Sequence, residues 1–175
     1  MTAAAKTGAP STSRVLVAVV MGSKSDWEVM QHTTATLNEL GVAHEVRVTS
    51  AHRTPDATFQ YASELAGRGI EVVIAAAGGA AHLAGVMAAK TALPVLGVPL
   101  VAGALNGLDA LLATVQMPGG IPVATFAIGK PGAVNAALFA GAVLGNKYPD
   151  VQSAVARFRK NQTDTVLAIG DPRGS

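Results

Sequence analysis

The chain has 175 residues and a formal net charge of +2, but only 14% of its residues are charged and 4% are aromatic. An average soluble domain has about a quarter charged residues, so we expect copies of the chain to cover part of its surface. Scattered basic residues with few aromatics do not form a nucleic-acid groove, and no clean stretch of ~20 apolar residues predicts a membrane span. The absence of cysteine excludes disulfides and thiolate chemistry.

Residues 1–13 are polar and alanine-rich and lack the apolar core of a secretory signal. We expect them to form a disordered tail on a cytoplasmic protein. No internal repeat or linker divides the rest, so residues 14–175 are expected to form a single catalytic α/β domain.

Apolar runs and amphipathic stretches alternate along this domain. Continuous apolar runs predict strands that are buried on both faces. These runs are Arg14–Met21, Val72–Ala77, Pro94–Val98 and Pro122–Ile128. The run His44–Val48 instead alternates, with Glu45 and Arg47 expected to face outward, and this pattern predicts an edge strand.

Helices are predicted between the strands. The first begins at Ser25, which with Glu28 fits a capping box, and ends at Gly41. The second begins at Thr54 and ends near Gly69. Three more are expected after His82, around Leu108–Val115 and over Ala133–Leu144.

A last helix is predicted at about residues 150–170. Its apolar side favours two interpretations equally: the helix folds back on its own domain, or it packs on a neighbouring subunit. Small residues along the preceding helix, such as Ala137 and Gly141, also leave a face that another backbone could approach closely.

This alternation predicts an α/β three-layer sandwich around a parallel sheet. If the second strand is at the edge, the order 2-1-3-4-5 of flavodoxin-like folds follows. In such sheets ligands bind beyond the carboxyl ends of the strands. The polar residues of the chain gather in the loops expected there, which read GSKSD, SAHRTPD, GGAAH, PLVAGALNG and GKPG.

The first loop is typical of a ribosyl phosphate site. Gly22, Ser23 and Ser25 lead into a helix N-terminus, which favours a phosphate, and Asp26 suits ribose hydroxyls. The alternative is that Ser25 only caps the helix and Asp26 only complements its dipole.

The second and third loops add an arginine and two histidines. Arg53 follows Ser50, Ala51 and His52 and is suited to a bidentate phosphate contact, while His82 ends a glycine-rich loop. Each of these three could instead be a solvated surface residue. We assign no role to the other two histidines, and no cluster of side chains resembles a metal site.

Several motifs together resemble the N5-carboxyaminoimidazole ribonucleotide mutases, the catalytic subunits of phosphoribosylaminoimidazole carboxylase in purine biosynthesis. They are VMGSKSDW, SAHRTPD, AGGAAHLAGVMAAKT, PVLGVPL, QMPGGIPVAT and QTDTVLAIGDPRG, and the similarity extends over about residues 14–174. In the segment AAAGGAAHLAG, Ala76 and Ala84 stand where other versions have Gly and Pro, and neither change removes a functional group.

The resemblance implies a homo-octamer with active sites near subunit contacts and with neither metal nor organic cofactor. It implies movement of a carboxyl group from N5 to C4 of aminoimidazole ribonucleotide. It also implies functional coupling to the ATP-dependent synthetase that makes the N-carboxylated substrate.

The resemblance also implies a role for each residue of the loops. It makes His52 and His82 catalytic and Asp26 the ribose ligand. Ser23, Ser25, Ser50 and Arg53 become phosphate contacts. The remaining substrate-binding residues are Gly22, Ala51, Gly79, Ala80, Ala81 and Leu83.

Three other functions stay open from the sequence. A related branch carboxylates aminoimidazole ribonucleotide directly with CO2 and has Lys at the position of Arg53, so SAHRTPD favours the mutase. A flavin-binding electron carrier would suit the fold, but the chain has one Trp and two Tyr with which to stack a flavin. A non-catalytic nucleotide sensor would retain its function without His52.

Overall fold

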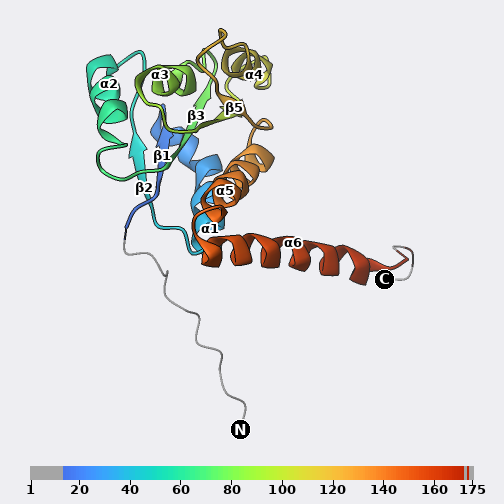
Figure 1. The fold of residues 1–175 in the computed structure, drawn as a ribbon. Coiled ribbons are helices and arrows are strands. Elements are labelled where there is room, and N and C mark those ends of the chain that lie inside the picture. The colour runs from blue at the N-terminus through green and yellow to red at the C-terminus, as the bar shows by residue number, and fades with distance from the viewer. Residues whose placement is uncertain (1–13, 172, 174–175) are drawn as a thin grey trace.

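The computed structural model describes residues 14–171 and 173, so the tail expected over residues 1–13 lies outside the described residues. Its five strands form one parallel sheet in the order β2-β1-β3-β4-β5, which confirms the predicted topology (Figure 1). The strands are β1 (Val17–Met21), β2 (His44–Val48), β3 (Val72–Gly78), β4 (Val95–Leu100) and β5 (Ala124–Thr125).

Six α-helices cover the two faces of the sheet (Figure 1). They are α1 (Trp27–Glu39), α2 (Pro55–Glu64), α3 (Leu83–Lys90), α4 (Leu108–Val115), α5 (Lys130–Gly145) and α6 (Pro149–Ile169). The helices α1, α5 and α6 pack together on one face, while α2, α3 and α4 lie on the other. The predicted three-layer sandwich is therefore confirmed.

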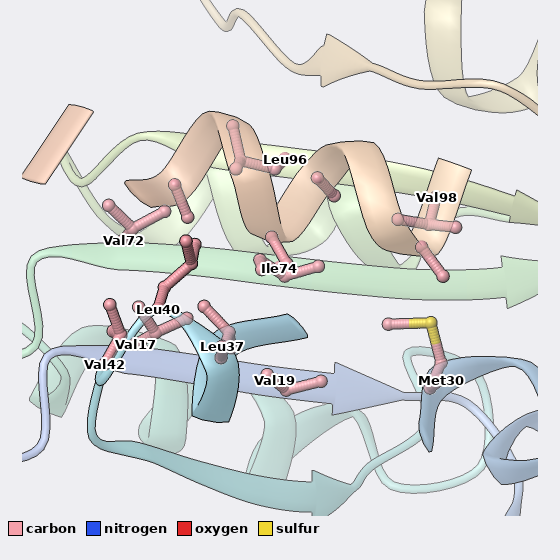
Figure 2. Close-up of a cluster of buried hydrophobic side chains, with 14 of the residues drawn as sticks. Val17, Val19, Met30, Leu37, Leu40, Val42, Val72, Ile74, Leu96 and Val98 are labelled. Carbon is pink, nitrogen blue, oxygen red and sulfur yellow. The ribbon is translucent and has the colours of Figure 1, made fainter. Parts of the chain in front are cut away.

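Two hydrophobic cores lie in the structure, one on each face of the sheet. Successive side chains of each strand point to opposite faces and so contribute to both cores. Val17 and Val19 of β1 point toward α1 and α5, where they lie beside Ile74 and Leu37 (Figure 2). The other residues of β1, such as Val20, point to the opposite face of the sheet, into the hydrophobic cluster under α2 and α3. Since both faces are buried, these strands need apolar residues at every position, which explains the continuous runs in the sequence.

The start of the first helix differs from the prediction. A short 3-10 turn, Lys24–Asp26, precedes α1, and the capping box joins Ser23 to Asp26 rather than Ser25 to Glu28. The Ser23 N–H donates to Asp26 Oδ2 at 2.9 Å, and the Ser23 hydroxyl accepts from the Ser25 N–H at 3.4 Å. Because of this extra turn, the capping residue is Ser23, which lies two residues closer to β1 than the predicted Ser25.

The outward face of β2 was also wrongly predicted. Glu45 lies on the α2 side, where it accepts a hydrogen bond from Tyr61, and Arg47 lies over the Tyr61 ring. Val46 and Val48 face the opposite side and are 44% and 53% exposed, because no helix of the described chain covers the sheet edge there.

Several boundaries also differ from the prediction, and β1 and α5 begin at Val17 and Lys130 rather than at Arg14 and Ala133. Only Ala124 and Thr125 of the run Pro122–Ile128 pair with β4, and α2 ends at Glu64 instead of near Gly69. After Glu64 the chain continues in turns as far as Gly69.

The first half of helix α6 folds back on its own domain, which is one of the two interpretations that the sequence left open. Val151 and Ala154 are buried against α5, whereas all described residues from Arg159 onward are exposed. Figure 1 shows this second half extending away from the rest of the chain. Within residues 14–171 and 173, no helix is both long and apolar enough to cross a bilayer.

Candidate active site

A cavity of about 450 Å³ opens at the carboxyl edge of the sheet. Loops after β1, β2, β3 and β4 form it, as expected for this topology. Its lining residues are Gly22, Ser23, Ser25, Asp26, Ser50, Ala51, His52, Arg53, Ala77, Gly78, Ala80, Leu83 and Ala102.

The loop after β1 carries hydroxyl groups and one carboxylate to the cavity. The Ser25 hydroxyl donates to the Ser23 hydroxyl at 3.0 Å, so the two serines lie side by side. Asp26 is half-buried, and this burial raises its pKa, while hydrogen bonds from the Ser23 and Gly22 N–H groups and the charge of Arg53 oppose the rise. Its carboxylate is thus held in a fixed orientation beside the serines.

Arg53 joins the loops after β1 and β2. Its guanidinium donates to the Gly22 carbonyl oxygen at 2.7 Å and to the Ser50 hydroxyl at 3.3 Å. The Ser50 hydroxyl also accepts from the Arg53 N–H at 3.1 Å, and the Ser50 carbonyl accepts from the Thr58 hydroxyl at 3.2 Å. The Arg53 cation and the hydroxyl groups of Ser23, Ser25 and Ser50 therefore lie at one end of the cavity.

The two candidate catalytic histidines are in direct contact. His52 Nε2 and His82 Nδ1 are 2.8 Å apart, and the rings meet edge to face with centroids separated by 4.9 Å. One nitrogen of the pair donates and the other accepts, so a single proton lies between the rings. Both side chains are exposed, and His82 stands at the N-cap of α3.

Most of the residues selected from the sequence lie around this cavity, but three do not line it. His82 reaches it only through His52, while Gly79 and Ala81 belong to the same loop without lining the space. The loop after β5, GKPG, also supplies no lining residue. The binding and catalytic roles of all these residues stay predictions.

Three small residues of the cavity wall were not among the site residues selected from the sequence, although two of them, Gly78 and Ala102, lie in the loops GGAAH and PLVAGALNG. Ala77 and Gly78 end β3, and Ala102 follows β4. At Gly78 an added Cβ would lie 2.7 Å from the Ala102 Cβ, so the two strand ends approach each other too closely for a side chain there. Their position after buried strands was the only signal, because small apolar residues carry no chemical signature.

The side chains of this site can exchange protons through two histidines, and they lie near a cation and serine hydroxyl groups that can donate hydrogen bonds to an anion. Among residues 14–171 and 173, no group of three or more His, Cys, Asp or Glu side chains is arranged to hold a metal ion. None of the lining residues is an aromatic residue on which a flavin could stack.

The sheet order and the cavity define the class of protein: a flavodoxin-like α/β sandwich with a cavity at the carboxyl edge of its sheet. Comparison with known proteins gives the family. The family model described as AIR carboxylase matches residues 16–165, and the chain therefore belongs to that family.

Similar proteins support this assignment. The N5-carboxyaminoimidazole ribonucleotide mutase of Pseudomonas aeruginosa is 61% identical over 158 residues, which cover 90% of this chain and 97% of that protein. The bifunctional purine synthesis protein purC/E of Dictyostelium discoideum is 55% identical over 88% of this chain but only 15% of its own length. The crystal structure of Treponema denticola PurE has a TM-score of 0.82 over 91% of this chain and 99% of that one; at 21% identity it supports the fold.

Proposed function

We propose that the protein is an N5-carboxyaminoimidazole ribonucleotide mutase of purine biosynthesis. It converts the N5-carboxylated nucleotide into 4-carboxy-5-aminoimidazole ribonucleotide. The observation that carries the proposal is that one cavity brings together a cation, several hydroxyl groups and His52. The 61% identical relative of nearly equal length bears the name of this enzyme.

The phosphate of the substrate binds at the end of the cavity formed by Ser23, Ser25, Ser50 and Arg53. Hydroxyl and guanidinium groups donate to phosphate oxygens, and the guanidinium supplies the compensating charge. Asp26 lies next to these serines and accepts hydrogen bonds from the ribose hydroxyls. The aminoimidazole ring then extends toward His52 and the loop after β3.

The carboxyl group moves in two steps. His52 donates a proton to N5 as the C–N bond breaks, which releases CO2 and leaves neutral aminoimidazole ribonucleotide. C4 then attacks the retained CO2, a C–C bond forms, and the now neutral His52 removes the C4 proton to restore the aromatic ring. Histidine suits both steps, because its ring titrates near neutral pH.

Small, apolar wall residues hold the CO2 between the two steps. Ala80 and Leu83 line the cavity on either side of His82 in the sequence, Gly79 and Ala81 belong to the same loop as Ala80, and Gly22 and Ala51 contribute backbone near the nucleotide. His82 contacts His52 Nε2 and orients that ring. The reaction needs no electrophilic cofactor, because the carbamate itself releases CO2 and the aminoimidazole carbon is electron-rich.

The test follows the consumption of two substrates at low CO2. The protein is incubated with aminoimidazole ribonucleotide plus bicarbonate, and separately with the N5-carboxylated nucleotide. The proposal predicts rapid conversion of the carboxylated nucleotide only. Conversion of aminoimidazole ribonucleotide alone would identify the direct carboxylase instead, and loss of neither substrate would contradict both reactions.

We also propose that the protein is a cytoplasmic homo-octamer that works without metal or organic cofactor. The low content of charged residues and the uncovered second half of α6 support self-association. Functional coupling to the ATP-dependent synthetase is a separate proposal, since the N-carboxylated substrate decomposes readily in water. The relative named purC/E joins a similar sequence to a longer purine synthesis protein.

A further inference from the structure

Two buried threonines lie behind the loop that carries His52 and Arg53. Thr49 directly follows β2 and Thr58 lies one turn into α2, and the two residues are 5% and 0% exposed. Their hydroxyl oxygens are 2.6 Å apart. Neither residue lines the cavity of the candidate active site. Burial of a hydroxyl group costs free energy unless hydrogen bonds compensate it, so the partners of this pair decide what it does.

The neighbouring carbonyl groups fix the directions of the hydrogen bonds. The Thr58 hydroxyl lies 3.2 Å from the Ser50 carbonyl oxygen and 2.9 Å from the Thr54 carbonyl oxygen. The Thr49 hydroxyl has Thr58 as its hydrogen-bond partner. Each hydroxyl has one proton to donate. Both are therefore satisfied when Thr49 donates to Thr58, and Thr58 donates to the two carbonyl groups.

This series of bonds connects the sheet to the loop 50–54. The Thr49 N–H donates to the Met21 carbonyl oxygen of β1 at 2.9 Å, which holds Thr49 at the end of the sheet. The Ser50 carbonyl also accepts from the Thr54 N–H at 3.0 Å, and the Ser50 N–H donates to the Thr54 hydroxyl at 3.0 Å. The two ends of the loop are thus tied to each other, and Thr58 ties both to the core.

The position of His52 depends on this backbone more than the position of Arg53 does. The Arg53 guanidinium has a separate attachment to the Gly22 carbonyl oxygen, at 2.7 Å. The His52 ring bonds to His82, which belongs to another loop and is itself exposed. A displacement of the loop therefore moves the imidazole, while the guanidinium keeps its attachment.

We infer that Thr58 is a positioning residue, which together with Thr49 holds the loop 50–54 so that His52 lies at the reacting carbon. The inference rests on the proposed function. The Thr58 hydroxyl does not touch the substrate and acts through the Ser50 and Thr54 carbonyl groups. A catalytic group that is misplaced by about 1 Å can lose about 10²-fold in rate, so a partial release of the loop should be measurable in kcat.

The first test compares two substitutions of Thr58. Thr58→Val keeps the shape of the side chain and removes the hydroxyl, whereas Thr58→Ser keeps the hydroxyl. With the N5-carboxylated nucleotide, we expect Thr58→Val to lose about tenfold in kcat with KM within about twofold of wild type, and Thr58→Ser to retain kcat. Thr33→Val is the matched control, because it removes an equally buried hydroxyl that donates to the Ala133 carbonyl oxygen at 2.9 Å, on the other face of the sheet. It should retain kcat.

The double variant Thr49→Val with Thr58→Val separates positioning from stability. In Thr58→Val the buried Thr49 hydroxyl loses its acceptor, so the thermal midpoint should fall by about 5 °C. The double variant removes both hydroxyls, so its midpoint should recover toward the wild-type value while kcat stays low. A kcat that recovers together with the midpoint would overturn the positioning role, and so would a Thr58→Ser enzyme as slow as Thr58→Val.

Hydrogen exchange supplies a measurement that does not depend on the enzyme activity. In native protein, the peptide covering residues 50–58 contains the Arg53 and Thr54 N–H groups, which donate to the Ser50 hydroxyl and carbonyl. These amides should exchange at least about tenfold faster in Thr58→Val than in wild type or Thr33→Val, because the loop opens more readily. Equal exchange rates would overturn the inference. A wild type that does not convert the nucleotide would contradict the proposed function and leave this result to decide the role of Thr58 in holding the loop.

Discussion

Arg53 allows the clearest quantitative prediction, because the structure gives the hydrogen bonds of its guanidinium group. A guanidinium has five N–H donors, and the bonds to the Gly22 carbonyl and the Ser50 hydroxyl use two of them. The remaining donors can bind a phosphate through two charge-assisted hydrogen bonds. Each such bond contributes about 1.5–3 kcal/mol, and the exposure of Arg53 favours the lower value.

Replacement of Arg53 by Ala should therefore remove about 3 kcal/mol of substrate binding, twice the lower value for one charge-assisted bond. At 1.4 kcal/mol for each factor of ten, KM should rise by about two orders of magnitude. The phosphate is distant from the reacting atoms, so binding is lost equally in the ground state and the transition state, and kcat should change little.

The assay is steady-state turnover of the N5-carboxylated nucleotide by wild type, Arg53→Ala, Arg53→Lys and Arg47→Ala. Arg53→Lys keeps the charge without the planar fork and should give an intermediate KM. Arg47→Ala removes a cation that lies over Tyr61 outside the cavity, and should leave KM near the wild-type value. An unchanged KM for Arg53→Ala, with a normal thermal midpoint, would refute the placement of the phosphate.

Three further predictions concern Gly78 in the cavity wall, the half-buried carboxylate of Asp26 and the last helix, α6. Gly78→Ala should destabilise the protein by about 1–3 kcal/mol, because the added methyl group overpacks against Ala102. Gly119→Ala is the control, since open space surrounds that glycine and its stability should not change. Equal thermal midpoints for the two variants would contradict this prediction. Burial raises the pKa of Asp26 above 3.8, so the unfolding free energy of wild type relative to Asp26→Asn should fall as pH rises through that raised pKa. If the unfolding free energies of wild type and Asp26→Asn changed with pH in parallel, the pKa of Asp26 would not be raised. Deletion of residues 159–175 should leave the fold intact by circular dichroism but lower the assembly mass, because every described residue in this stretch is exposed in the single chain. An unchanged mass would show that it serves no contact between copies.

The central strands could be predicted from the sequence because burial on both faces leaves a strong pattern. β3 and β4 are covered on each side, and their runs are apolar at every position. The edges of the sheet were harder to predict. Val46 and Val48 point toward a region that no helix of the described chain covers, so their exposure could not be deduced from alternation alone.

The candidate site was predictable as a set of loops but not as a geometry. The motifs that follow the strands indicated His52, Arg53 and Asp26, because parallel strands bring their carboxyl ends to one edge. The contact between His52 and His82 joins residues 30 positions apart and depends on the packing of two loops. The capping role of Ser23 likewise depended on a 3-10 turn that the sequence pattern did not reveal.

The most direct test of the proposed mechanism is the turnover number of His52→Asn. General acid–base catalysis contributes about 10²- to 10⁴-fold, so kcat should fall by at least two orders of magnitude while nucleotide binding and assembly mass remain near wild type. His32→Asn, which changes a half-buried histidine of α1 that does not line the cavity, should retain full activity. A His52→Asn enzyme that turns over at the wild-type rate would contradict the assignment of this cavity as the site of carboxyl transfer.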